Sequence, residues 1–424
     1  MSTENMTVLD GILKDHYTDI IRDQTEPDEE IFKTFEKMTD AEWSGDGRQA
    51  IAVADLSHNE GIGAIAEDSN LPTAGNFDPQ QFKIPMKYQY ASFKMTAQVM
   101  KSARNGKGAF TNAMNYSMNT TTRNLRRERS RMLWGYGEGR LALVNGAVSS
   151  STTVNVDAPG GVAGATGGGR YLREGMILSI DSGTDVAATI SSVAAAGTSI
   201  VTTAAISCDD NSIIYRLSTA GGIANTGEWG KSNEPMGLLG LIDDGTYVGT
   251  YYNLSRTTYP QLKSRVHASV GALSLDALQL NFDIAHQLGD GEIAMLAGHH
   301  STKRAYLALL EADRRYTGSD LQAPDGGTKA AKRGQYVTFS GVPFVDSKHA
   351  PYGMIFGIDK KDFHRYVQID GEWANESGAI LRQDTGKDTW TAFWRVWENY
   401  FLARPNTCFR MEGVTSTTVY VASY

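Results

Sequence analysis

The segment GEWGKS (227–232) contains residues that close a phosphate-binding loop, in which glycine amides and a lysine hold phosphate groups. The full motif needs a first glycine at position 225, which is Asn225, and a preceding apolar strand, which is missing. Gly61, Gly63 and Ala66 repeat part of the spacing of a dinucleotide-binding turn. Pro72 cuts short the helix that such a turn opens, so neither segment predicts nucleotide binding.

Two adjacent histidines, His299 and His300, precede Ser301, and these groups could bind a metal or act in hydrolysis. Adjacent residues point to different sides of a helix or strand, so the pair favours capping or packing over a metal site. No H-E-x-x-H, C-x-x-C or G-x-S-x-G motif occurs in the sequence. We therefore predict no catalytic residue, no cofactor and no metal, and a chain that is not an enzyme. A hydrolase built on these histidines and Ser301 is an alternative.

Five arginines form the basic cluster of the sequence, with Glu128 as the acidic residue among them. They are Arg123, Arg126, Arg127, Arg129 and Arg131. One interpretation is a solvated helix face, in which the pair of Glu128 and Arg131 contributes a few tenths of a kcal/mol. The other is a positive stripe that faces phosphate groups or acidic neighbours. The residue types leave both interpretations open.

A long helix must carry these arginines, and we predict it from about Ala109 to Tyr136, roughly 40 Å at 1.5 Å per residue. Its apolar stripe is thin and its first half is rich in Asn and Thr, which are poor helix formers. The stripe consists of Phe110, Met114, Met118, Leu125, Met132 and Tyr136. Residues 82–96, FKIPMKYQYASFKMT, alternate as a strand does. A half-apolar helix beside a long hairpin predicts a subunit that its neighbours complete.

Length and composition indicate a folded chain of several domains. The 424 residues suggest about three domains at roughly 150 residues each. A net charge of −8 argues against general nucleic-acid binding, and 41% apolar content fits a folded protein. No apolar run approaches the roughly 20 residues that span a bilayer, and the N-terminus shows no signal-peptide pattern. Cys208 and Cys408 are predicted to be free, buried thiols in a reducing cytosol.

The first half of the sequence predicts three further units. Residues 1–50 indicate an extended arm with one or two helical turns, and residues 51–80 a long hairpin with a mobile tip. Residues 141–220 nearly lack charge and are rich in Ser, Thr, Val, Ala and Gly. This composition, with regular turn signals, predicts an inserted all-β barrel or sandwich.

The second half predicts helices on a mixed sheet. Residues 274–288 form one helix, with Ser274 as N-cap, and residues 301–316 another. The interleaved strands are predicted at 292–297, 336–339, 342–345 and 353–358. Residues 388–405 are aromatic on both faces, which is typical of a buried central strand.

This order of elements resembles the major capsid proteins of tailed double-stranded DNA bacteriophages, with the Hong Kong 97-type fold. Four stretches also resemble that family: GAIAEDSNLPTAGNF (63–77), KIPMKYQYASFKMTAQVM (83–100), RRERSRMLWGYGEGRLALV (126–144) and GLLGLIDDG (237–245). The resemblance implies an α+β capsid fold with an N-arm, an extended β-hairpin loop, a long spine helix, a mixed-sheet axial domain and an inserted small all-β domain.

The resemblance also assigns a part to each segment. It implies an N-terminal arm at 1–50, the extended loop at 51–95, a peripheral domain with the spine helix at 96–140, the inserted domain at 141–220, a continuation of the peripheral domain at 221–270, the axial domain at 271–375 and peripheral return strands at 376–424. The simplest members of the family lack the inserted domain. Its role, as a brace within the capsomer or a platform for decoration, stays open.

The implied function is a structural major capsid protein that self-assembles into hexamers and pentamers of the icosahedral shell around phage DNA. Expected locations are the virion and, during assembly, the host bacterial cytoplasm. Expected partners are other copies, packaged DNA bound non-specifically at the inner face, a portal and a cement or decoration protein, but no membrane. Only about 50 residues precede the extended loop, so we expect a separate scaffolding protein and no fused one. A tail or fibre binding module built around residues 141–220 is the alternative.

Candidate assembly residues follow from the same resemblance. They are Glu67, Asp68, Lys83 and Lys87 around the extended loop, with the five arginines Arg123, Arg126, Arg127, Arg129 and Arg131 on the helix. Some family members cross-link through a lysine of this loop and a distant asparagine. Lys83 and Lys87 lie near the matching region, but the sequence identifies no partner for them.

Overall fold

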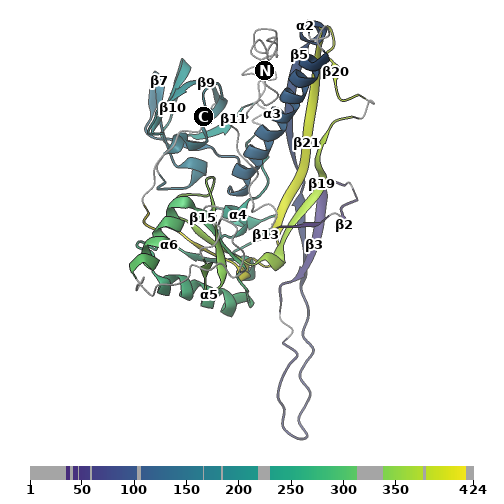
Figure 1. Ribbon diagram of the computed structural model, residues 1–424. Coiled ribbons are helices and arrows are strands. Elements are labelled where there is room, and N and C mark those ends of the chain that lie inside the picture. Colours follow the sequence, from purple (N-terminus) through teal and green to yellow (C-terminus); the bar gives the residue numbers. More distant parts are fainter. Residues whose placement is uncertain are drawn as a thin grey trace, which may run out of the picture.

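The computed structural model describes residues 35–416, apart from residues 39–41, 46, 58–59, 103–106, 166, 183–184, 218–229, 313–337 and 376–378. Figure 1 shows four parts: a long sheet with its helix, a β-barrel, a six-stranded sheet with two helices, and a hairpin that projects beyond the other three. Most of the predicted N-terminal arm, residues 1–34, lies outside the described residues.

The long sheet is built around β21 (Thr389–Leu402), which pairs antiparallel with β19 (Phe363–Trp373) and with β5 (Lys87–Thr96). Two short strands, β1 (Glu36–Met38) and β20 (Arg382–Gln383), complete it. A strand with apolar and aromatic residues on both faces needs cover on both sides. The sequence predicts this central position for β21, and the structure confirms it.

The alternating segment 82–96 is divided between two sheets. In the hairpin, β4 (Pro79–Pro85) pairs with β3 (Gln49–Asp55), and the short β2 (Glu42–Trp43) lies on the other side of β3. The next strand, β5, pairs with β21. The predicted end of the extended loop at residue 95 is therefore wrong, because residues 87–95 belong to the long sheet. Pro85 marks the change, since a proline has no N–H with which to continue a ladder.

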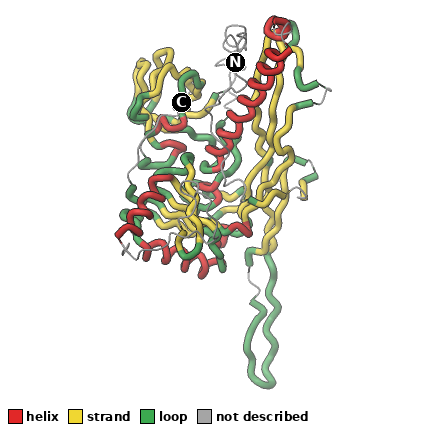
Figure 2. Tube along the Cα trace, viewed as in Figure 1, coloured by secondary structure: helices red, strands yellow, loops and turns green. Residues whose placement is uncertain are grey.

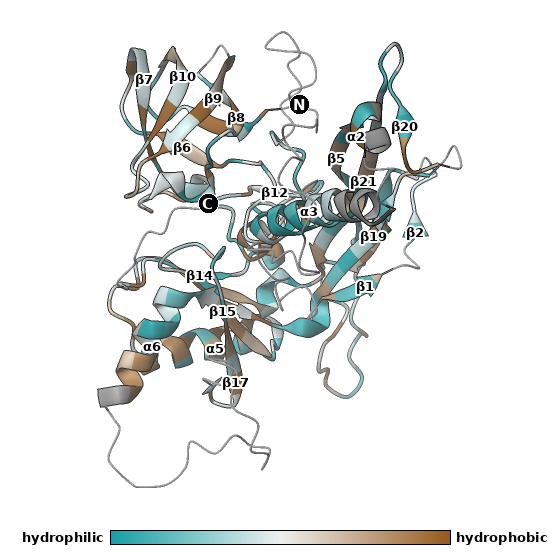
Figure 3. Ribbon diagram, turned by 45° about the horizontal axis from the view of Figure 1, so that its top comes forward, coloured by the Kyte–Doolittle hydropathy of each residue, from teal (hydrophilic) through white to brown (hydrophobic). Residues whose placement is uncertain are grey.

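The long helix α3 (Lys107–Leu133) follows the short α2 (Ala97–Ser102) and packs along β5. In Figure 3, the coloured part of its ribbon consists largely of hydrophilic residues. Leu125 and Leu133 are buried, but so are the polar residues Ser117, Glu128, Ser130 and Arg131. Polar pairing, as well as the thin apolar stripe, therefore holds this helix in place.

The low-charge segment forms a closed barrel with the strand order β10-β7-β6-β11-β8-β9. The strands are β6 (Ala142–Val144), β7 (Val148–Asp157), β8 (Ile177–Asp181), β9 (Asp185–Val193), β10 (Ser199–Cys208) and β11 (Ile213–Arg216). The 3₁₀ turns η3 (Pro159–Gly161) and η4 (Gly168–Tyr171) follow β7. Alternating side chains such as Val154, Val156 and Ile200 fill a core that belongs to the barrel alone. The sequence left a barrel and a sandwich open, and the structure has a barrel.

The third part is a mixed sheet in the order β14-β22-β18-β15-β17-β16, which carries two helices. Its strands are β14 (Arg265–His267), β15 (Met295–His299), β16 (Thr338–Phe339), β17 (Val342–Ser347), β18 (Ile355–Ile358) and β22 (Phe409–Met411). The helices are α5 (Leu275–Gly289) and α6 (His300–Ala312). The Ser274 hydroxyl accepts a hydrogen bond from Ala277 N at 3.0 Å, which confirms the predicted N-cap.

Two strands cross the predicted domain boundaries. β19 lies within the segment predicted to be axial, yet it pairs with β21 in the long sheet. β22 lies within the segment predicted to return to the peripheral domain, yet it pairs with β14 and β18. Both assignments are wrong, because the periodicity of a strand reports how it is buried and not which sheet it joins.

The joint between the two sheets is formed mostly by short elements and loops (Figure 2). They are α4 (Leu238–Leu241), β12 (Thr250–Tyr251), β13 (Leu254–Ser255), η5 (Pro260–Leu262), η6 (Lys360–Asp362) and η7 (Pro405–Thr407). One apolar core joins Leu238 and Tyr251 of this region to Phe82, Phe356 and Phe401. Among the helices that the structure describes, none is both long and apolar enough to cross a membrane.

Candidate functional site

The projecting hairpin presents apolar side chains to solvent. Its β3 and β4 pair without interruption, and residues 60–78 extend the ribbon away from the body (Figure 1). Near the tip, Ile62 and Leu71 are 87% and 81% exposed, and Phe77, at the end of the ribbon next to β4, is 67% exposed. The predicted assembly residues Glu67 and Asp68 lie on the same tip and are also exposed. The tip therefore carries apolar and acidic side chains that the described part of the chain leaves largely exposed to solvent.

The base of the hairpin is fixed to the body. The Asn253 side chain accepts a hydrogen bond from Lys83 N and donates one to Gln81 O, both at 2.8 Å, which satisfies one edge of β4. The Lys83 side chain is exposed. Lys87 donates a hydrogen bond to Ser232 O at 2.6 Å, and burial lowers the pKa of its amine. Of the two predicted lysines, Lys83 thus faces solvent and Lys87 has a partner within the chain.

The predicted arginine cluster is divided between different surroundings. Arg129 donates two hydrogen bonds, each of 2.8 Å, to the carboxylate of Glu398 on β21. Glu398 is fully buried, and it also meets Arg365 Nε at 2.9 Å and accepts a hydrogen bond from the Tyr400 hydroxyl at 2.9 Å. This carboxylate therefore ties α3 to β19 and β21 across the long sheet.

Arg131 is also buried and pairs within the chain. Its guanidinium group contacts Glu234, which follows the barrel, and Glu128 one turn earlier on α3. Burial alone would lower the pKa of Arg131, but the two carboxylates raise it. The interpretation of the cluster as a solvated helix face is therefore wrong for Arg129 and Arg131.

The other three arginines of the cluster lie elsewhere on α3. Arg126 is exposed, and Arg123 and Arg127 are half-buried. Burial lowers the pKa of Arg127, while the charge of Glu128 raises it. For these three side chains, a contact with phosphate groups or acidic residues of another molecule stays a prediction.

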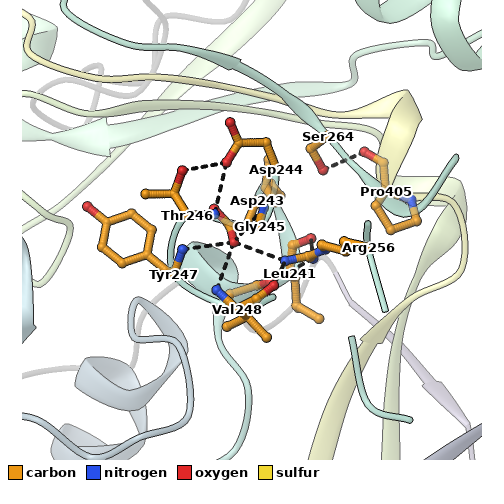
Figure 4. A network of polar contacts seen from close by, with 12 residues as sticks. Leu241, Asp243, Asp244, Gly245, Thr246, Tyr247, Val248, Arg256, Ser264 and Pro405 are labelled. Atoms are coloured by element: carbon orange, nitrogen blue, oxygen red, sulfur yellow. Dashed lines mark hydrogen bonds and ion pairs between the residues drawn. The ribbon is translucent and has the colours of Figure 1, made fainter. Parts of the chain in front are cut away.

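A second buried carboxylate, Asp243, organises the joint between the sheets (Figure 4). One of its oxygens accepts hydrogen bonds from the backbone N–H groups of Gly245, Tyr247 and Val248 at 2.9–3.1 Å, and from Arg256 at 3.0 Å. Its other oxygen accepts a hydrogen bond from Arg410 on β22 at 2.9 Å.

Both guanidinium groups of this network are almost fully paired. Arg256 also donates to the carbonyl oxygens of Gly240, Leu241, Val248 and Leu262, at 2.9–3.1 Å. Arg410 also donates to the carbonyl oxygens of Leu239 and Ile242. The side chains of Asp243, Arg256 and Arg410 are 0–1% exposed. Asp243 thus has a structural role, because both of its oxygens are buried and already accept hydrogen bonds from the protein.

The two adjacent histidines lie at the start of α6 and make local contacts there. His299 Nδ1 accepts a hydrogen bond from Ser301 N at 3.1 Å and lies 2.8 Å from the Ser301 hydroxyl. His300 and Lys303 both pair with Asp346 on β17. Within the described residues, no cluster of three or more His, Cys, Asp or Glu side chains could hold a metal ion. The geometry is that of capping and packing.

Acid should destabilise the folded chain through a buried histidine. Burial, followed by the charges of Lys348, Arg170 and Arg127, lowers the pKa of His349 from 6.5 to about 3. Between pH 3 and 6.5 the unfolded chain binds a proton that the folded chain excludes. Stability is therefore complete above pH 6.5 and falls with decreasing pH, by at most about 1.4 kcal/mol per pH unit.

Urea unfolding at pH 6.5 and 4.5 measures this effect. The variant His349→Gln should lose less stability between these pH values than the wild type. The exposed His286 provides the control, because His286→Gln should leave the pH response unchanged. An equal response of the wild type and His349→Gln would contradict the assignment.

Other motifs in the sequence have structural positions. Gly61, Gly63 and Ala66 lie in the hairpin tip, a described segment without a helix. Residues 227–229 of the loop-like motif lie outside the described residues, and Lys231 pairs with Asp181 at 2.8 Å. Both cysteines are free and buried, as predicted, and burial raises the pKa of Cys408 to about 12.

Sequence reasoning missed the carboxylates that pair with the arginines: Glu234, Asp243 and Glu398. Glu398 is an acidic residue inside an aromatic strand, and a charge in such a run signals a buried partner. Its partner Arg129 is 269 positions away, so the pairing itself could not be predicted.

No family model and no curated protein matches this sequence. Among solved structures, the chain is similar to the cyanophage A-1(L) capsid asymmetric unit, with a TM-score of 0.55 at 11% identity, covering 95% of this chain and 98% of that chain. It is also similar to the capsid of the native GTA particle, with a TM-score of 0.51 at 11% identity, covering 98% of this chain and 100% of that chain. The chain has a phage-capsid fold.

The predicted resemblance is thus confirmed at the level of the fold. The α+β capsid fold places the long helix, the long sheet and the mixed sheet in one chain with the projecting hairpin. Within this capsid fold, the buried carboxylates hold the parts together. The candidate contact surfaces of the chain are the hairpin tip and the three arginines of α3 outside these buried pairs, Arg123, Arg126 and Arg127.

Proposed function

We propose that this chain is the structural major capsid protein of a tailed double-stranded DNA phage. In this role it assembles into the hexamers and pentamers of an icosahedral shell around the phage DNA. The phage-capsid fold supports the proposal. The observation that carries it is the projecting hairpin, where Ile62 and Leu71 near the tip and Phe77 next to β4 are exposed. A lone two-stranded ribbon is marginal in water, so a second copy that covers the tip would stabilise both molecules.

The same arrangement suits a shell built from many modest contacts. Closed symmetry repeats each contact in every subunit, and the contacts together resist internal pressure without one strong bond. In this proposal Glu67, Asp68 and Lys83 contact neighbouring copies. Arg123, Arg126 and Arg127 face acidic neighbours or DNA phosphates. Its place is the virion, after assembly in the host bacterial cytoplasm with a separate scaffolding protein, a portal and a cement or decoration protein.

The purified full chain tests this function directly. Size-exclusion chromatography with negative-stain imaging should show pentamers, hexamers or shells. A solitary monomer at every concentration, with the hairpin folded against its own body, would exclude the proposal.

Charges at the hairpin tip should abolish assembly while leaving the fold intact. In the double variant Ile62→Asp and Leu71→Asp, each subunit contact would lose the burial of two large apolar side chains, about 1.5–3 kcal/mol each. Thermal unfolding of the unassembled chain should change little, because both residues are exposed. Sedimentation should show the loss of capsomers and shells.

The matched control adds the same charge at polar positions of the same tip. Ser69→Asp with Thr73→Asp should assemble at near wild-type yield, because both side chains are exposed and polar. Equal assembly of the two double variants would show that the apolar tip makes no contact between copies.

A further inference from the structure

The entry path of the barrel and residues 230–232 on its exit path lie tightly side by side. Ser232 N, on the exit path, donates a hydrogen bond of 3.0 Å to Glu138 O on the entry path. Gly139 has a φ of +78°, and a Cβ atom there would overlap the carbonyl oxygen of Gly230. The buried pair of Arg131 and Glu234 then fixes the exit path to α3. The described residues of the two paths thus form a neck that is held against α3.

A second attachment joins the barrel to α3 near the C-terminal end of the helix. Arg173, after η4, and Arg216, at the end of β11, both pair with the carboxylate of Glu128. Arg131 of the helix approaches the same carboxylate at 3.2 Å. Burial alone would raise the pKa of Glu128, but the charges of Arg216, Arg131 and Arg173 lower it to about 2. A single helix carboxylate therefore holds two barrel arginines.

A third attachment joins the barrel to the six-stranded sheet. Arg170 in η4 is 7% exposed and donates a hydrogen bond of 2.9 Å to Ala350 O. Its guanidinium group lies over the Tyr352 ring, 4.3 Å from the centroid. Next to it, the Tyr171 hydroxyl donates a hydrogen bond of 2.8 Å to His349 O. These acceptors belong to the connection between β17 and β18, so the barrel contacts the sheet domain directly.

We propose that the barrel is an internal brace, which fixes the position of α3 relative to the six-stranded sheet. The neck alone would suffice for a module that only carries a binding surface. The second and third attachments place the barrel against both neighbours at once, as in Figure 3, where the barrel lies beside α3 and the sheet domain. Glu128 is the key residue, because its loss would leave Arg173 and Arg216 without the carboxylate they share. This function acts within one chain and does not depend on assembly.

Distances between spin labels in the full chain test the brace. Labels at Asn124→Cys on α3, Ser191→Cys on the barrel and Gln279→Cys on α5 occupy exposed positions. The native Cys208 and Cys408 are buried, and burial raises the pKa of both thiols, so labelling is selective. Double electron–electron resonance measures the distance between the labels on α3 and the barrel, and between the labels on α3 and α5. Without a further substitution, both distance distributions should be narrow.

The substitution Glu128→Ala should widen both distributions by about twofold. Arg216, a half-exposed partner of Glu128, provides a milder variant: Arg216→Gln should also widen both distance distributions, but by less. This second variant keeps the test valid if Glu128→Ala fails to fold. The exposed barrel residue Glu174 gives the control, since Glu174→Gln removes a carboxylate charge, as Glu128→Ala does, next to Arg173. If the distribution of distances between α3 and α5 stays narrow in both test variants, the barrel does not act as a brace. This conclusion holds even if the distances between α3 and the barrel change.

Discussion

Replacing Asp243 by alanine should destabilise the folded chain by about 3–5 kcal/mol. The variant would leave Arg256 and Arg410 buried without the carboxylate that both share. Three backbone N–H groups, those of Gly245, Tyr247 and Val248, would lose their acceptor at the same time. Since a native domain is stable by only about 5–15 kcal/mol, the variant should be largely insoluble or unfolded at physiological temperature.

Urea unfolding of the soluble fraction measures the loss, at one fixed protein concentration because self-association shifts apparent stability. The adjacent Asp244 provides the matched control. It is only half-buried, and the hydrogen bonds it accepts, from Thr246 N at 3.1 Å and the Thr246 hydroxyl at 2.7 Å, are local. Asp244→Ala should cost about 1 kcal/mol. A similar small cost for Asp243→Ala would show that the two arginines need no shared carboxylate.

The pair Asp243–Asp244 also shows what a sequence can and cannot tell. Both lie in GLLGLIDDG, a stretch that resembles a capsid family, and the resemblance predicted the fold correctly. Nothing local distinguishes the fully buried aspartate from its half-buried neighbour. The distinction comes from Arg256 and from Arg410, which is 167 positions away, and only the folded chain brings them together.

Local patterns predicted the elements whose causes are local. The alternation in β5, the aromatic run of β21 and the N-cap at Ser274 each depend on neighbouring residues, and the type of each element was predicted correctly. The barrel was visible because its composition changes abruptly, from charged residues to Ser, Thr and Val. Such signals need no knowledge of distant partners.

Pairing between distant strands could not be predicted in the same way. Nothing in the sequence of β19 says that it pairs with β21 and not with the strands of the mixed sheet. The arginines of α3 show the same limit for side chains. Arg127 and Arg129 are two positions apart on one helix, yet Arg129 alone pairs with Glu398 on the opposite sheet. A helix face is set by what packs against it, and charge pattern alone does not report that.

Replacing Glu398 by glutamine should cost about 3 kcal/mol of stability, because two arginines would lose the charge that matches them. Arg129 and Arg365 are only 16% and 12% exposed, so water can replace the carboxylate only in part. Burial lowers the pKa of Arg129, and the nearby Glu398 outweighs this effect and raises it. Urea unfolding should show the loss, and near-ultraviolet circular dichroism should report looser packing of Trp394 and Trp397 on the same strand.

A double-mutant cycle separates this pair from general damage to the strand. Arg129→Met, Glu398→Gln and the combined variant should give a coupling energy of about 2 kcal/mol, since each single change leaves a buried charge that the other removes. The surface pair of Glu372 and Arg395 in the same sheet is the comparison. Glu372 is 51% exposed, so Glu372→Gln should cost less than about 1 kcal/mol. A coupling energy near zero for Arg129 and Glu398 would mean that this pair does not hold α3 to the long sheet, and that apolar contacts and the other ion pairs of the helix hold it in place.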